Sequence, residues 1–420
     1  MRRTTTSSIE DTTQQPVMPL GSRLGFVGAT ASLVAVFAAS GAPIPLYERY
    51  RVADGLSTGD LSIAAVTYFV AVMIALVVLG RLSDHVGRRA VALTAVSLAA
   101  AGSLALLDVT GLAVLMAGRA LQGLACGLGS SAVAAYIVDL APAKPRWLAA
   151  TLVAGSPLTG LTVGAIGSGA LGEYAPAPDQ TPYLAVTALL AACAVVLMVS
   201  PETTARRPGA MSSLRPHVHL PQTIRPLLPA AIAVFFGTWA LGGFYQAFSP
   251  TISAQSLGTT NTLIAGIVFA SFMAPYVVGG PLAGALSPVR AQRIGMVVFA
   301  FSVMGIVIGL RTGEIVTVIL CGIVAGAAQG AAFTGSMRSL LQRIGPAERA
   351  GLMATVYLFS YCGAAVPSLI SGRLAAEGLT LETIALGYAG LAIIAAVVVL
   401  AGAGRGGARP GGRTSSTPPG

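Results

Sequence analysis

The chain has 420 residues, of which 55% are apolar and only 10% are charged, and its mean hydropathy is +0.79. A soluble globular protein carries about a quarter charged residues, so this composition excludes an ordinary water-soluble enzyme and indicates helices in a lipid bilayer. The formal net charge of +10 does not indicate a nucleic-acid partner, because the basic residues are spread in short clusters between apolar runs.

Twelve apolar runs, each long enough to cross a bilayer, follow one another along the chain. The first six cover residues 24–46, 61–80, 90–107, 112–138, 147–170 and 182–200. The last six cover residues 227–249, 262–286, 293–310, 315–337, 350–372 and 382–402. The runs predict an all-α membrane protein of twelve transmembrane helices. The polar tails, 1–22 and 403–420, are expected to be disordered.

A polar linker over residues 201–226 divides the runs into six at 23–200 and six at 227–402. A weak repeat supports this division, because Gln122-Gly123 in the fourth run has a counterpart at Gln329-Gly330 in the tenth. We therefore expect two pseudo-symmetric six-helix bundles. Transporters with such repeats bind their substrate between the repeats, near the bilayer midplane.

The basic residues fall almost entirely in alternate loops. If both termini are cytoplasmic, the external loops contain only Arg49, Arg51, Arg311 and Arg373. Positively charged loops stay on the cytoplasmic side. The pattern predicts a multi-pass protein of the cell membrane with both ends inside.

The loop between the second and third runs contains the pattern Gly-x-x-x-Asp-x-x-Gly-Arg-Arg over residues 80–89. Gly80 permits close helix approach, Gly87 permits a tight turn, and Asp84 suits a helix N-terminus. Arg88 needs an acceptor, for which Asp139 at the inner end of the fourth run is the natural candidate.

This pattern resembles the signature of the major facilitator superfamily, and the likeness extends over nearly the whole chain. The stretch 42–50 is similar to the end of the first helix in many bacterial sugar- or drug-efflux permeases of that family. The resemblance implies that the cluster closes the cytoplasmic side in the outward-facing state. That role is assigned to Gly80, Asp84, Gly87, Arg88, Arg89 and Asp139. The alternative is ordinary positive-inside charge.

Arg119 is the only charged residue in the core of any predicted span. Placing arginine there costs about 2.5–3.5 kcal/mol, so it should face the bundle interior, with Gln122 on the same helical face. The resemblance implies a role in substrate binding or proton coupling. The alternative is a structural arginine satisfied by backbone carbonyls.

Further candidates come from spacing and resemblance. Gly155, Pro157, Gly160 and Gly164 resemble the glycine- and proline-rich fifth helix of exporters in this family, although small residues at this spacing also serve ordinary helix packing. The expected apolar, aromatic cavity includes Trp239, Tyr245, Gln246, Gln329, Tyr357 and Tyr361, with packing as the alternative. No span core contains Asp or Glu, so the candidate proton carriers are the edge residues Glu48, Asp60 and Asp108.

The sequence thus predicts a monomeric secondary active transporter for a small-molecule substrate, a proton-linked antiporter that exports drug-like or small metabolite compounds by rocking-switch alternating access. No ATP-binding loop and no intramembrane catalytic set are present, so an enzyme, a cofactor and a metal are not expected. The alternatives are an uptake transporter or facilitator for an organic anion or sugar, and a non-transporting membrane sensor.

Overall fold

The computed structural model describes residues 20–145, 147–214, 222–345 and 348–402, and every regular element within these ranges is helical. The tails expected to be disordered lie outside the described residues, except that the first helix already begins at Leu20.

Apolar runs become helices near the predicted positions, because a buried backbone in lipid must satisfy its own hydrogen bonds. The first half of the chain forms α1 (Leu20–Gly41), η1 (Ile44–Leu46), α2 (Tyr47–Ala53), α3 (Thr58–Ile74), the π-helical turn η2 (Ala75–Leu79), α4 (Ser83–Val86), α5 (Arg88–Ala105), α6 (Leu112–Leu128), the π-helical turn η3 (Gly129–Val133), α7 (Ala134–Leu140), α8 (Leu148–Tyr174) and α9 (Thr181–Met198).

The second half forms α10 (Ala210–Ser213), η4 (Gln222–Leu227), α11 (Leu228–Thr251), the π-helical turn η5 (Ile252–Ser256), α12 (Thr262–Met273), α13 (Tyr276–Leu282), α14 (Pro288–Thr312), α15 (Ile315–Leu341), α16 (Arg349–Ala376) and α17 (Leu381–Gly402).

Eleven helical stretches in the described part of the chain are long and apolar enough to cross a membrane, which makes this a multi-pass membrane protein. The third predicted span, 90–107, falls on α5 and is not among them. Arg88 and Arg89 occupy the first turn of α5 and lower its mean hydropathy. The predicted count of twelve therefore depends on α5 and stays a prediction.

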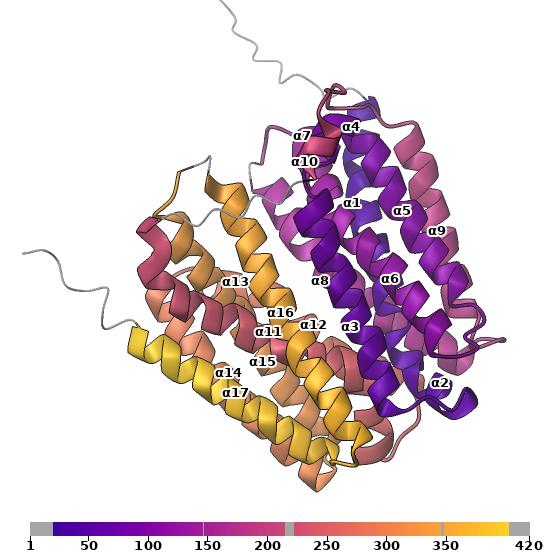
Figure 1. Ribbon diagram of the computed structural model, residues 1–420, viewed down its shortest axis with the longest axis vertical. Coiled ribbons are helices and arrows are strands. Elements are labelled where there is room, and N and C mark those ends of the chain that lie inside the picture. Colours follow the sequence, from indigo (N-terminus) through magenta and orange to yellow (C-terminus); the bar gives the residue numbers. More distant parts are fainter. Residues whose placement is uncertain (1–19, 146, 215–221, 346–347, 403–420) are drawn as a thin grey trace, which may run out of the picture.

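The helices lie in two groups, drawn from indigo to magenta and from red to yellow in Figure 1. The first group comprises α1 to α9 and the second comprises α11 to α17, and they contact each other mainly along α3–α16 and α8–α12. Glycines permit the close approach: a Cβ on Gly59 would lie 3.0 Å from the Gly372 carbonyl oxygen, and one on Gly266 would lie 2.6 Å from that of Ala165.

The two seams are tight at one end of the molecule only. They close the end that carries α2, which we call the α2 end (Figure 1). Toward the opposite end, which carries α4, a Cβ on Gly155 would meet only the Val277 side chain, at 3.9 Å. The groups are therefore closed against each other at the α2 end and separate toward the α4 end.

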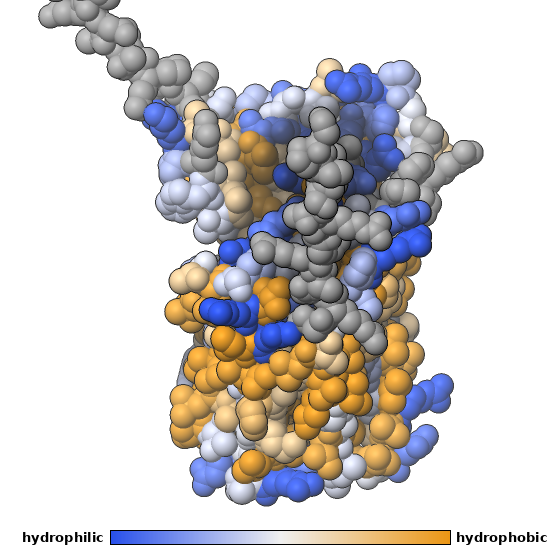
Figure 2. Space-filling view, turned by 90° about the vertical axis from the view of Figure 1, so that its left-hand side faces the viewer, coloured by the Kyte–Doolittle hydropathy of each residue, from blue (hydrophilic) through white to orange (hydrophobic). Residues whose placement is uncertain are grey.

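The side of the second group turned away from the first carries a broad apolar zone between hydrophilic regions (Figure 2). Exposed side chains in the second group include Phe301 on α14, Val316 on α15 and Ile394 on α17. Exposed large apolar residues in such number suit contact with lipid rather than water.

Candidate functional site

The centre of the first group is built around a break in α1. Pro43 has no N–H, so the Ala39 carbonyl four residues earlier has no helical donor. Side chains of α6 bind the carbonyls at this break: Gln122 Nε2 donates to the Ala39 oxygen at 2.8 Å, and Arg119 Nη1 donates to the Ser40 oxygen at 2.7 Å. Arg119 and Gln122 thus replace part of the backbone bonding that ends with α1.

Arg119 is fully buried, with 0% of its surface exposed. Its Nη1 also donates to Gln122 Oε1 at 2.9 Å, and its guanidinium carbon lies 4.4 Å from the ring centroid of Tyr68. Its Nε and Nη2 have no hydrogen-bond partner among the described residues. Backbone carbonyls therefore account for only part of this guanidinium, and two buried nitrogens remain able to donate.

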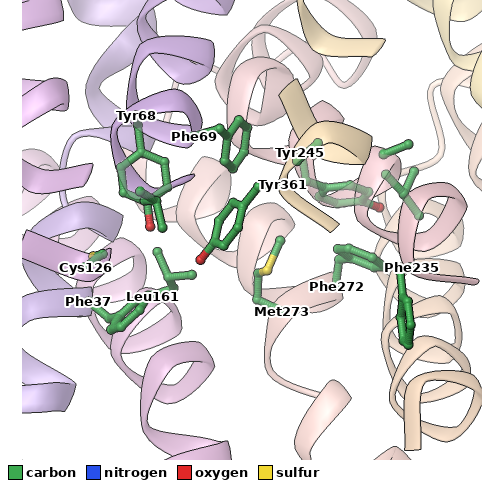
Figure 3. Packing of buried hydrophobic residues seen from close by; sticks show 14 of the residues in the cluster. Phe37, Tyr68, Phe69, Cys126, Leu161, Phe235, Tyr245, Phe272, Met273 and Tyr361 are labelled. Carbon is green, nitrogen blue, oxygen red and sulfur yellow. The ribbon is translucent and has the colours of Figure 1, made fainter. Parts of the chain in front are cut away.

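Next to Arg119, an aromatic junction links the two groups. Tyr68 and Phe69 of α3 are 5.4 Å apart between ring centroids, and Phe69 lies 6.3 Å from Tyr361 of α16. Tyr361 in turn contacts Trp239 of α11 at 4.9 Å and Tyr357 at 6.4 Å. Figure 3 shows Tyr361 projecting toward Tyr68, Phe69 and Leu161. The junction brings together three predicted residues and two, Tyr68 and Phe69, that the sequence interpretation missed.

The junction presents flat apolar faces and a free donor. Trp239 and Tyr357 are only half-buried, whereas Tyr361 is 5% exposed. Trp239 Nε1 has no hydrogen-bond partner within the described ranges. Aromatic faces stack on planar or apolar ligands, and an unpaired indole N–H can orient one polar group of such a ligand.

Three other predicted cavity residues are buried in the second group. Tyr245 is fully buried and stacks on Phe272 with 5.2 Å between ring centroids, inside the second group. Gln246 is 3% exposed, and its Nε2 has no partner in the described part of the chain, while Gln329 is 7% exposed on α15. The observed contacts of Tyr245 match the packing alternative.

The glycines of α8 serve helix packing at two positions. Gly160 and Gly164 face α1, where added Cβ atoms would overlap the carbonyl oxygens of Val34 and Ala38. Pro157 lies inside α8 without ending it. Gly155 instead faces Val277 of α13 in the second group.

The cluster around Arg88 is assembled at the α4 end. Arg88 Nη1 lies 2.6 Å from Asp84 Oδ1, and its Nε lies 3.3 Å from Asp139 Oδ2. Gly87 adopts φ +111°, a conformation that side chains other than glycine rarely adopt. Gly80 follows the π-helical turn η2, close to the backbone of Leu76.

A further member of this cluster, Glu202, was absent from the predicted gate. Its Oε1 accepts a hydrogen bond from the Arg88 backbone N–H at 2.8 Å, and its Oε2 accepts one from that of Arg89 at 3.2 Å. The Arg89 side chain donates to the Ser200 carbonyl at 3.0 Å. A carboxylate at the N-terminus of α5 is stabilised by the helix dipole. The sequence feature that could have identified Glu202 is the polar segment Ser200-Pro201-Glu202-Thr203 at the end of the sixth apolar run.

The predicted proton carriers have local partners or are exposed. Glu48 pairs with Arg51 at 2.7 Å. Asp60 forms a capping box with Ser57 at the start of α3. Asp108 is exposed between α5 and α6.

An all-helical multi-pass protein whose two groups of helices meet at a central junction has the architecture of a secondary transporter. The chain belongs to the Major Facilitator Superfamily, whose family model matches residues 25–307, and this confirms the resemblance noted in the sequence. A crystal structure of the nucleoside transporter NupG has a similar fold, with a TM-score of 0.66 and 14% identity, over 90% of this chain and 99% of that one. No curated protein sequence matches the chain.

Family membership makes this chain a transporter of a small-molecule substrate. The prediction of an all-α membrane protein is confirmed for the described residues, whereas the count of twelve helices and the division into two six-helix bundles stay predictions.

Proposed function

We propose that the chain is a proton-linked exporter of drug-like or small metabolite compounds that works by rocking-switch alternating access. In this proposal the two groups are the six-helix bundles 23–200 and 227–402, joined by the linker 201–226. Helix α5 also crosses the membrane, which brings the number of membrane helices to twelve. The monomer lies in the cell membrane with both termini in the cytoplasm and the α2 end outside.

The observation that carries this proposal is the aromatic junction beside Arg119. A compound bound there would contact Trp239 and Tyr361 from the second group and Tyr68 from the first. Such a ligand contacts both groups at once, so its affinity for the protein depends on how the two groups are oriented. A ligand shifts a conformational equilibrium only by its differential affinity for the two states.

The seams between the two groups indicate which state of the proposed cycle the structure represents. With the α2 end outside, the tight contacts of Gly59 with Gly372 and of Gly266 with Ala165 close the external side. The structure then represents the inward-facing state of the proposed cycle. The glycine- and proline-rich α8 favours export.

The experiment is substrate-driven proton movement in proteoliposomes that contain a pH-sensitive dye. A panel of cationic, neutral and anionic compounds, with nucleosides included because of the NupG likeness, is added outside an acidic interior. We expect particular compounds to raise the internal pH in the wild type and not in Arg119→Ala. A wild type that binds these compounds without moving protons or solute contradicts the proposal and favours the non-transporting sensor.

Uptake of an organic anion is the second candidate, favoured by one observation. Arg119 Nε and Nη2 are buried and have no partner among the described residues, and a carboxylate could accept from both. Competition distinguishes the two candidates: simple carboxylates displace a neutral transported dye only if the guanidinium binds the anion directly. A pH-independent flux would instead indicate a facilitator.

A further inference from the structure

A cavity at the α4 end lies between the turn around α4 and the first residues of the linker. Its volume is about 450 Å³, which is within the range of small-molecule sites. Six residues line it: Arg81, Asp84, His85, Arg88, Thr204 and Arg207. Three of the six are arginines and only one is acidic, so the cavity is basic.

Hydrogen bonds fasten the first residues of the linker beside this cavity. The Arg207 backbone N–H donates to the His85 carbonyl at 2.9 Å, and His85 Nδ1 donates to the Pro208 carbonyl at 3.2 Å. The Thr203 hydroxyl donates to Asp139 Oδ2 at 2.9 Å. Helix α10, which follows these residues, contacts α4 (Figure 1). The backbone on both sides of Arg207 is therefore held, and the fold itself places this arginine at the cavity.

The charges at the cavity are not balanced. Asp84 and Asp139 both pair with Arg88, at 2.6 and 3.3 Å. The guanidinium groups of Arg81 and Arg207 have no hydrogen bond and no ion pair within the described ranges, and both residues are exposed. Two positive charges, one from the turn before α4 and one from the linker, thus border the same cavity without a counter-charge.

A phosphate group suits this arrangement. Its oxygens accept from several donors at once, and the planar fork of arginine matches them in geometry and charge. Thr204, which is half-buried, adds a hydroxyl donor to the same wall. We propose that this cavity binds a phosphate group, with Arg81 and Arg207 as its charged ligands. The group is carried by a soluble phosphate compound or by the headgroup of an anionic lipid. The site is distinct from the buried junction beside Arg119, and it does not depend on the proposed transport cycle.

The first test is the binding of radiolabelled inorganic phosphate to the full-length protein in an uncharged detergent, measured by equilibrium dialysis at constant ionic strength. We expect saturable binding to the wild type. The double variant Arg81→Gln/Arg207→Gln should bind at least about tenfold more weakly, because it loses both charge-assisted donors. The matched control is Arg290→Gln/Arg343→Gln, which removes two exposed arginines of the second group and should bind like the wild type. Equal melting curves check that both double variants are folded.

The second test distinguishes the two sources of the phosphate. The three proteins are released from nanodiscs of equal amounts of phosphatidylcholine and phosphatidylglycerol, and the lipids they retain are counted by native mass spectrometry. If a lipid supplies the group, the wild type and the control retain more phosphatidylglycerol than Arg81→Gln/Arg207→Gln. Equal retention, with phosphate binding lost only in Arg81→Gln/Arg207→Gln, indicates a soluble compound.

Two results overturn the proposal. One is that Arg81→Gln/Arg207→Gln binds phosphate and retains phosphatidylglycerol as well as the control variant does, because the two arginines would then form no site. The other is that the wild type binds no phosphate and retains no more phosphatidylglycerol than Arg81→Gln/Arg207→Gln.

Discussion

Replacing Gly169 by alanine should separate the two groups at the α2 end. The added Cβ would lie 2.5 Å from the Thr262 carbonyl oxygen and 3.0 Å from the Leu263 Cα, both of them backbone atoms that no rotamer change can move. Because an ordinary C···O contact is about 3.3 Å, α8 and α12 must separate by about 0.8 Å. Overpacking of this kind costs about 1–3 kcal/mol.

The penalty applies only while the seam is closed, so the closed state should lose about 5- to 150-fold in population relative to the state open at the α2 end. The matched control is Gly167→Ala on the same helix, where an added Cβ has no neighbour within 4 Å. Both substitutions raise helix propensity equally.

The assay is the distance between spin labels at Asp54→Cys, directly after α2 in the first group, and Leu379→Cys, between α16 and α17 in the second, both of them exposed positions. It is measured in each alanine variant. We expect a longer distance in Gly169→Ala and a wild-type distance in Gly167→Ala. Identical distance distributions in the two variants would refute the reasoning, because they would show that the seam is not the contact that closes this end. Gly266→Ala, whose Cβ would lie 2.6 Å from the Ala165 carbonyl oxygen, should behave like Gly169→Ala.

Three other substitutions test the site. Arg119→Lys should lower initial transport rates at least about tenfold without unfolding the protein, because an ammonium keeps the charge but cannot reproduce the planar set of donors. Trp239→Ala should weaken substrate binding by about 0.5–1.5 kcal/mol in calorimetric titrations, because the ligand loses the aromatic face of Trp239, and Trp239→Phe should restore this part of the affinity but not the part due to the indole N–H. Glu202→Gln should lower stability in detergent by about 1 kcal/mol, since two backbone N–H groups of α5 lose a charged acceptor; equal melting curves for Glu202→Gln and Glu377→Gln would contradict this.

Most of the fold could be predicted because an apolar run in a bilayer must satisfy its own backbone hydrogen bonds and therefore forms a helix. The predicted spans coincide with helices along the chain, with edges displaced by a few residues where a polar end continues the helix, as at Arg311 in α14. The interruption at 274–275, between α12 and α13, was not predicted, because Pro275 is tolerated within a membrane span and composition does not reveal a break.

The site was only partly predictable. Arg119 stood out because a charge within an apolar run needs a partner. Tyr68 and Phe69 gave no such signal, since aromatic residues are ordinary in a membrane span. The hydrogen bond from the Thr262 backbone N–H of α12 to Glu173 Oε2 of α8, at 3.0 Å, could not be predicted either. The two residues are 89 positions apart in the chain, and only the packing of α8 on α12 brings them together.

The exposed basic residues at the α4 end make the molecule sensitive to salt. The bonds of Arg88 to Asp84, Asp139 and Glu202 lie wholly within the first group, so the rigid-body movement of the proposed cycle would leave them in place. That movement would change the distance between the exposed Arg81 and Arg207 and the exposed Arg290 and Arg343 of the second group. Closing the α4 end therefore brings like charges together. Ions screen this repulsion over about 8 Å at physiological strength, so the balance between the two states varies with the ionic strength of the solution at that surface.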